Sequence, residues 1–141
     1  MSVEVQELAC RQGHIGLLTL NAAQTLNALT EDMVNQAQET LDRWATDDRI
    51  CMVVLQGSGE RAFCAGGDVR SMSELLDGTS QTPAWQRTHS EKALSVAFWN
   101  CDRPIIAAVN GHAVGVGLSY ASMCDFRIAS DKAQFGGVWV R

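Results

Sequence analysis

The sequence predicts an α/β fold in which strands of a largely parallel sheet alternate with covering helices. Residues 50–57 (ICMVVLQG) are nearly all apolar, which is typical of a strand buried on both faces. Residues 30–46 instead place Met33, Ala37, Leu41 and Trp44 at helical spacing on one face. A chain of 141 residues can bury a core of its own, so a single domain over residues 1–141 is expected.

The remaining elements follow in order along the chain. Residues 14–21 predict the first strand, and Thr30 is placed to N-cap the helix over 30–46. A short extended segment at 62–64 leads into a glycine-rich turn, after which Asp68 is expected to N-cap a second helix. The later segments predict a loop at 77–83, a helix at 85–100, a strand at 105–109, a helix at 114–123 and a strand at 126–129. In the 85–100 helix, the side expected to be buried holds Ala93, Leu94, Val96, Ala97 and Phe98.

Two glycine-rich turns follow predicted strands, and they are the candidate functional segments of the chain. One is the segment 64–68 (CAGGD), and the other is the segment 110–117 (NGHAVGVG). Turns of this kind leave backbone N–H groups unpaired and directed at one point, which suits the binding of an anion or an oxyanion. Two such turns predict a single site with two converging N–H donors.

The composition of the chain excludes some classes of partner and indicates the cellular compartment. A net charge of −5 argues against nucleic acid as a partner, and no apolar run is long enough to span a bilayer. The five cysteines are odd in number and form no CxxC pair, which predicts neither a disulfide framework nor a metal site. Residues 1–7 show neither a secretory pattern nor an Arg-rich transit pattern. A reducing compartment is therefore expected, cytoplasmic or an organelle matrix.

Five segments occur in a distinctive order: 26–29 (LNAL), 61–69 (RAFCAGGDV), 103–113 (RPIIAAVNGHA), 124–129 (CDFRIA) and 132–136 (KAQFG). Together they resemble the enoyl-CoA hydratase/isomerase (crotonase) superfamily from about residue 15 to residue 136. The resemblance implies a crotonase-like ββα spiral, acyl-CoA thioester substrates, a homo-oligomer (trimer or hexamer) and no cofactor beyond the CoA of the substrate. The apolar ending at 135–141 suggests that the chain stops before the family's C-terminal helical region.

The resemblance also assigns roles by position. It places the oxyanion donors at the backbone amides of Gly67 and Val116, and CoA contacts at Ala28, Ala65, Gly67 and Val69. The positions of the two hydratase glutamates hold Ser119 and Trp139, neither of which can serve as acid or base in hydration.

Three functions stay open from the sequence. The first is an enzyme of the hydratase/isomerase type that stabilises a thioester enolate. The second is an acyl-CoA hydrolase, because residues 63–70 (FCAGGDVR) also resemble 3-hydroxyisobutyryl-CoA hydrolases. The third is a non-catalytic acyl-CoA-binding or assembly subunit, which the two missing glutamates favour.

Several other side chains have a structural and a chemical interpretation. The structural one is preferred for Asp68 as a cap, Cys64 as a buried residue and His112 as a packing residue. It is also preferred for Glu74 as a solvated residue and for Ser119 as a small residue facing the pocket rather than a nucleophile. For Arg61 and Arg70, pairing with CoA phosphates and simple surface exposure are equally supported. For Trp139, a place in the lining of an acyl pocket and simple packing are equally supported.

Overall fold

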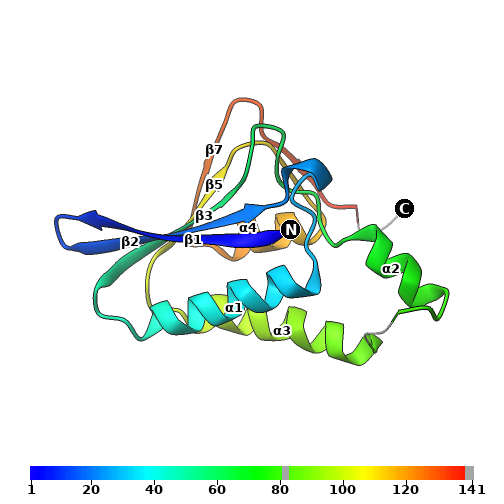
Figure 1. Ribbon diagram of the computed structural model, residues 1–141. Coiled ribbons are helices and arrows are strands. Elements are labelled where there is room, and N and C mark those ends of the chain that lie inside the picture. Colours follow the sequence, from blue (N-terminus) through cyan, green and yellow to red (C-terminus); the bar gives the residue numbers. More distant parts are fainter. Residues whose placement is uncertain (81–82, 139–141) are drawn as a thin grey trace.

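The computed structural model describes residues 1–80 and 83–138, and a five-stranded sheet forms its centre (Figure 1). The strand order is β1-β2-β3-β5-β7. Neighbours run parallel except for β1, which is antiparallel to β2. The strands are β1 (Ser2–Cys10), β2 (Gly13–Asn21), β3 (Ile50–Gly57), β5 (Ile105–Val109) and β7 (Phe126–Ala129). The predicted alternation of parallel strands and helices is confirmed.

Helices α1 (Glu31–Ala45) and α3 (Ala84–Asn100) lie side by side against one face of this sheet (Figure 1). The Thr30 hydroxyl accepts a hydrogen bond from the Met33 amide at 3.3 Å, which confirms the predicted N-cap. The apolar face of α1 is buried as predicted. Its fully buried Trp44 lies directly over Gly16 of β2, where a larger residue would leave no room for the ring.

The opposite face of the sheet has no helix against it in the part of the chain that the structure describes. On that face Val54 of β3 is half-buried, and its neighbours along the register are Ile106 and then Phe126. Phe126 and Ile128 are 63% and 66% exposed. The prediction that residues 50–57 are buried on both faces is therefore wrong within the described residues, because α1 and α3 cover the same side.

A second, three-stranded parallel sheet was not predicted. It consists of β4 (Ala62–Cys64), β6 (His112–Val114) and β8 (Gln134–Gly136), in the order β4-β6-β8. Because β6 occupies the residues after Asn110, helix α4 (Val116–Met123) begins two residues later than expected. Strands of three residues are too short to show a periodic pattern, which is why β6 and β8 escaped prediction.

The remaining helical segments are the 3₁₀ turn η1 (Ala23–Thr25) and helix α2 (Val69–Leu76). In α3, Leu94, Ala97 and Phe98 are buried as predicted, but Val96 is 55% exposed. Val96 was wrongly assigned to the buried side, since it lies two residues from Leu94 and therefore on the far side of the helix.

Arg127 of β7 secures the end of α4 against the large sheet. Its guanidinium donates hydrogen bonds to the carbonyl oxygens of Ala121, Ser122 and Cys124 at 3.1, 3.2 and 2.7 Å. Carbonyls at the C-terminal end of a helix lack partners within the helix, and a cation there also interacts favourably with the negative end of the helix dipole. The position of α4 is thus determined at its C-terminal end by one side chain of β7.

No helix in the described residues has both the length and the apolar character needed to cross a membrane.

Candidate functional site

The two glycine-rich turns lie against each other at the end of the small sheet. Cys64 of β4 is paired with Ala113 of β6 in parallel register. Gly67 lies three residues after Cys64, and Val116 lies three residues after Ala113. The predicted donors therefore occupy equivalent positions on neighbouring parallel segments.

Gly66 shows how close the turns are. Its φ is +108°, which side-chain-bearing residues rarely adopt. A methyl group on Gly66 would lie 3.3 Å from the Val114 carbonyl oxygen and 3.9 Å from the Val116 nitrogen. The backbone next to Gly67 therefore contacts the backbone at the start of α4, and only a residue without a side chain fits between them.

Neither predicted donor amide is used by the fold. Within residues 1–80 and 83–138, the N–H groups of Gly67 and Val116 have no hydrogen-bond acceptor. Val116 is the first residue of α4, and the helical bonds begin only with the Ser119 amide, which donates to Gly115 O at 3.1 Å. The helix dipole adds partial positive charge at this end. The result is a half-buried spot that favours a negatively polarised oxygen.

Gly117 allows α4 to reach the first turn. A methyl group at this position would overlap with the Cys64 carbonyl oxygen and lie 2.7 Å from Cys64 Cβ. Any side chain at 117 would push the start of the helix away from β4. The separation of the two amides therefore depends on this close contact.

The residues expected to contact CoA gather around the first turn. Ala65 N–H donates to Leu26 O at 3.0 Å, and Leu29 N–H donates to Gly66 O at 2.8 Å. These bonds bring the segment containing Ala28 alongside Ala65 and Gly67. Val69 is 74% exposed at the start of α2. The structure thus brings Ala28 close to Ala65 and Gly67, with Val69 exposed two residues after Gly67.

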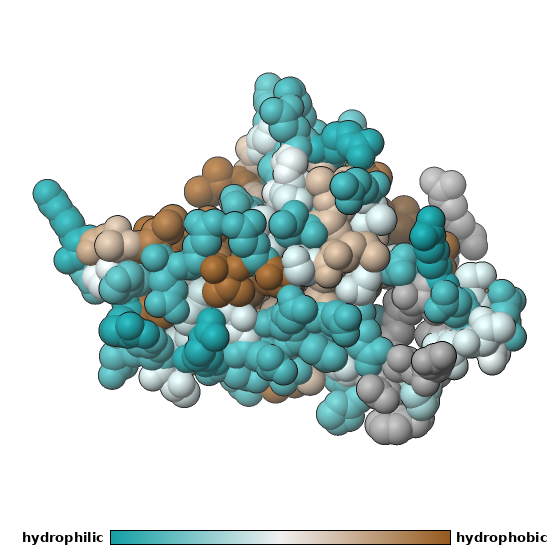
Figure 2. Space-filling view, viewed as in Figure 1, coloured by the Kyte–Doolittle hydropathy of each residue, from teal (hydrophilic) through white to brown (hydrophobic). Residues whose placement is uncertain are grey.

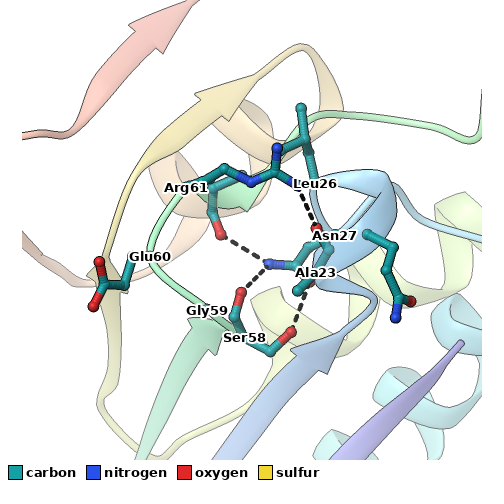
Figure 3. Close-up of a pocket in the computed structure, with 9 residues that line it drawn as sticks. Ala23, Leu26, Asn27, Ser58, Gly59, Glu60 and Arg61 are labelled. Carbon is teal, nitrogen blue, oxygen red and sulfur yellow. Dashed lines mark hydrogen bonds between the residues drawn. The ribbon is translucent and has the colours of Figure 1, made fainter.

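Asn27 holds the same segment in place from inside (Figure 3). The residue is fully buried and has a φ of +56°. Its side-chain oxygen accepts from the Ala22 amide at 2.9 Å and from the Ser58 hydroxyl at 3.0 Å. Its side-chain nitrogen donates to Ser58 O at 3.0 Å and to Ala62 O at 2.8 Å. One side chain therefore connects the loop before α1 to the loop before β4.

Asn110 also forms hydrogen bonds to the loop between β3 and β4. Its oxygen accepts from the Gly57 amide at 3.3 Å, and its nitrogen donates to Gly59 O at 2.7 Å. The sequence interpretation included Asn27 and Asn110 in its motifs but gave neither a positioning role. The available signal was an amide side chain placed directly after an apolar strand or turn, where it can replace backbone partners.

A cavity of about 190 Å³ opens beside these asparagines, lined by Ala23, Leu26, Gly59, Arg61 and neighbouring residues (Figure 3). The Arg61 side chain is exposed and reaches across the cavity to donate to Ala23 O at 3.2 Å. A guanidinium group at the rim of a cavity can bind a phosphate group. The structure thus shows Arg61 exposed and bonded to a backbone carbonyl, and its pairing with a phosphate stays a prediction.

The structure places each of the other candidate residues as a helix cap, as an exposed residue or as a half-buried one. Asp68 accepts from the Arg70 amide at 3.3 Å, which confirms its predicted capping role in α2. Glu74 and Arg70 are exposed, and His112 lies on strand β6 rather than in a turn. Ser119 is half-buried on α4, and Trp139 lies outside the described residues.

Cys64 and Cys124 are buried thiols rather than reactive ones. Burial raises the pKa of Cys64 from 9.0 to about 11 and the pKa of Cys124 from 9.0 to about 12. A thiol that stays protonated near neutral pH is a poor nucleophile. The preference for a structural role at Cys64 is consistent with its complete burial.

These two thiols predict a loss of stability in alkaline solution. Below pH 9 they are neutral in both states, whereas above pH 9 the unfolded chain releases protons that the folded chain retains. The free energy of unfolding should therefore fall from pH 9 towards pH 11, by about 1.4 kcal/mol per pH unit for each thiol. Urea unfolding of wild type and Cys124→Ala at pH 8, 9 and 10 measures this. An equal slope in Cys124→Ala and wild type would contradict it.

A carboxylate that the sequence interpretation did not consider lies near the site. Glu91 of α3 lines a small cavity with Leu29, whose backbone is paired with Gly67. The charge of Glu91 contributes, after burial, to raising the pKa of Tyr120 on α4, the helix against which α3 packs. The signal in the sequence was its spacing, because Glu91 shares a helix face with the buried Leu94 and Phe98.

Two adjacent glycine turns with free amides, set on an α/β framework, define a protein of the enoyl-CoA hydratase/isomerase family. The chain belongs to this family, since residues 15–137 match its profile, described as Enoyl-CoA hydratase/isomerase. Among individual relatives, the mitochondrial 3-hydroxyisobutyryl-CoA hydrolase of Bos taurus is 36% identical over 125 residues, covering 89% of this chain and 32% of the hydrolase. A probable enoyl-CoA hydratase of Rhizobium meliloti is 39% identical, covering 89% of this chain and 46% of the relative.

Solved structures agree with the sequence relatives. The crystal structure of an enoyl-CoA hydratase from Polaromonas sp. JS666 matches with a TM-score of 0.78 at 29% identity, covering 96% of this chain and 50% of the other. The predicted crotonase-like α/β fold is thereby confirmed. The chain spans about a third to a half of the length of these relatives.

Proposed function

We propose that this protein acts on acyl-CoA thioesters and binds the thioester carbonyl oxygen between the amides of Gly67 and Val116. The observation that carries the proposal is the pair of amides without acceptors on adjacent turns. Family membership supports the substrate class. Donors directed at an oxygen that gains negative charge stabilise an enolate or a tetrahedral intermediate, each donor being worth about 3–4 kcal/mol in comparable sites.

The rest of the substrate would extend from the two amides along the segments that contain Ala28, Ala65 and Val69. Ala28, Ala65 and Val69 would contact the CoA portion, and Arg61 at the rim of its cavity would pair with a phosphate. The acyl group would lie on the other side of the amides, towards α3 and α4.

Proton transfer needs a group with a suitable pKa, and Ser119 does not provide one. Glu91 is our candidate, because it lines the cavity beside Leu29 and lies on α3, which packs against α4. With this carboxylate the protein would isomerise or hydrate an enoyl thioester through an enolate. No metal or redox group is needed for that step.

A thioester hydrolase is the second candidate, and the similarity to the bovine 3-hydroxyisobutyryl-CoA hydrolase favours it. Here the same two amides would stabilise the tetrahedral intermediate formed when water attacks the carbonyl carbon. The carbon–sulfur bond then breaks and CoA leaves as a thiol. Release of free thiol separates this reaction from isomerisation or hydration, which leave the thioester intact.

Calorimetric titration with butyryl-CoA, with free CoA as the control, tests the proposal. We expect butyryl-CoA to bind at least tenfold more tightly than free CoA, because only the thioester presents a carbonyl to the two amides. Equal affinities would refute the carbonyl site while leaving CoA binding intact.

Turnover of crotonyl-CoA and release of CoA thiol then separate the candidate functions. Glu91→Gln should retain binding and lose turnover, and Glu74→Gln on the exposed face of α2 is the matched control. Tight thioester binding without any turnover in wild type would support the non-catalytic alternative. The homo-oligomer and the cytoplasmic or organelle-matrix location stay predictions.

A further inference from the structure

Two thiols from distant segments meet at the end of the large sheet farthest from the proposed site. Cys10 is the last residue of β1, and Cys51 is the second residue of β3. Their sulfur atoms lie 3.4 Å apart, although 41 positions separate them in the sequence. Cys10 is exposed and Cys51 is half-buried.

The local backbone explains the contact across an intervening strand. Cys10 pairs with Gly13 at the turn between β1 and β2, so it is the last residue of β1 before the hairpin loop (Figure 1). The β2–β3 register shifts between His14 and Ile15, which is the irregularity of a bulge. The Cys51 thiol also contacts His14 O at 3.2 Å. The strand between the two cysteines therefore does not keep them apart.

The other three cysteines provide an internal comparison. Cys64 and Cys124 are buried, and Cys101 is half-buried. Within the described residues none of these three has another sulfur atom at hydrogen-bonding distance. Only the Cys10–Cys51 pair combines solvent access with a neighbouring thiol.

We propose that Cys10 and Cys51 form a reversible intramolecular disulfide when the protein meets a peroxide. The Cys10 thiolate attacks one peroxide oxygen, the O–O bond breaks, water leaves, and Cys10 becomes a sulfenic acid. The Cys51 sulfur then attacks the Cys10 sulfur, the S–O bond breaks, and a second water leaves. In total the two thiols lose two electrons and two protons, and one hydrogen peroxide becomes two water molecules. A dithiol reductant reverses the change by exchange.

The cross-link would join the β1–β2 hairpin to β3 and enclose the loop that contains β2 and α1. Closing a loop of this length reduces the freedom of the unfolded chain, so the melting midpoint should rise by about 5–10 °C. The glycine turns lie beyond the opposite end of β3, after Gly57. Ligand binding there should therefore be the same in the reduced and oxidised forms.

Peptide mapping tests the proposal directly. Trypsin releases Cys10 in the peptide 1–11 and Cys51 in the peptide 50–61, each without another cysteine. After treatment of the native protein with hydrogen peroxide and alkylation of free thiols, we expect these two peptides to be joined. Labelling under denaturing conditions should then count three free thiols instead of five.

Three variants complete the design. Cys10→Ser and Cys51→Ser should each abolish the linked peptide and the rise in melting midpoint, whereas Cys101→Ser should retain both. Five free thiols after a peroxide dose that oxidises the denatured chain would overturn the proposal. So would recovery of peptide 1–11 unlinked, with Cys10 as a sulfinic acid.

Discussion

Val116→Pro should reduce turnover of an acyl-CoA substrate by about 100- to 1000-fold, because it deletes one of the two donor amides. Proline is well tolerated at the first position of a helix, where the N–H has no helical partner. The preceding Gly115 has φ 55° and ψ −125°, which is close to the mirror image of the extended conformation that residues before proline prefer. The substitution therefore replaces the donor N–H with a bond from nitrogen to the ring Cδ and is compatible with the backbone at the start of α4.

Val116→Ala is the matched control, because it shortens the side chain and retains the N–H. The carbonyl stretching frequency of bound, carbonyl-labelled acyl-CoA gives a readout that does not need turnover. In wild type and Val116→Ala the frequency should be lowered relative to free acyl-CoA, and in Val116→Pro it should move back towards the free value. A melting midpoint close to that of wild type would show that Val116→Pro folds. Unchanged turnover and frequency in such a folded variant would rule out Val116 as a donor.

Asn27→Ala should lower the free energy of unfolding by about 3–5 kcal/mol, a large part of the stability of a typical domain. The change leaves the Ala22 amide without the acceptor that Asn27 provides, and it removes one of the two amide donors to the Ala62 carbonyl, which retains Asn110 at 3.2 Å. It also forces alanine into a left-handed backbone conformation, at φ +56°. Urea unfolding measures the loss.

Two further variants separate these causes. Asn27→Gly relieves the backbone strain but not the loss of hydrogen bonds, so it should be about 1 kcal/mol more stable than Asn27→Ala. Gln24→Ala, an exposed residue of the neighbouring 3₁₀ turn, should change the free energy of unfolding by less than about 0.5 kcal/mol. If Asn27→Ala were as stable as Gln24→Ala, the hydrogen bonds of Asn27 would contribute nothing net.

Much of the fold was predictable because its longer elements repeat a local pattern. The helix over 30–46 carried both an N-cap and an apolar face, and both were found at the expected residues. Strand β1 was not predicted, because nearly all its residues are exposed and show no buried pattern; pairing with β2 and contacts with α1 hold it in place. Strands β6 and β8 are defined by pairing between distant segments, which no local pattern records.

The candidate site was predictable in its backbone and not in its side chains. Glycine in two turns predicts a close approach of backbone atoms, and the contacts of Gly66 and Gly117 agree with that prediction. The positioning role of Asn27 and the place of Glu91 depend on segments that meet only in the folded chain. Helical spacing marked Glu91 as a carboxylate on an apolar face, but only the structure places it near α4.

Gly67 and Val116 each lie three residues after a residue of one strand pair, Cys64 and Ala113, and this has a consequence for the lengths of the two turns. Neighbouring parallel strands lie about 4.8 Å apart, so the pairing of Cys64 with Ala113 fixes where the two turns begin relative to each other. Point substitutions that preserve the close contacts of Gly66 and Gly117 leave this register unchanged. Insertion or deletion of one residue between Cys64 and Gly67, or between Ala113 and Val116, would offset one amide from the other. The relative position of the two predicted donors therefore depends on the lengths of these two short segments more than on most of the side chains beside them.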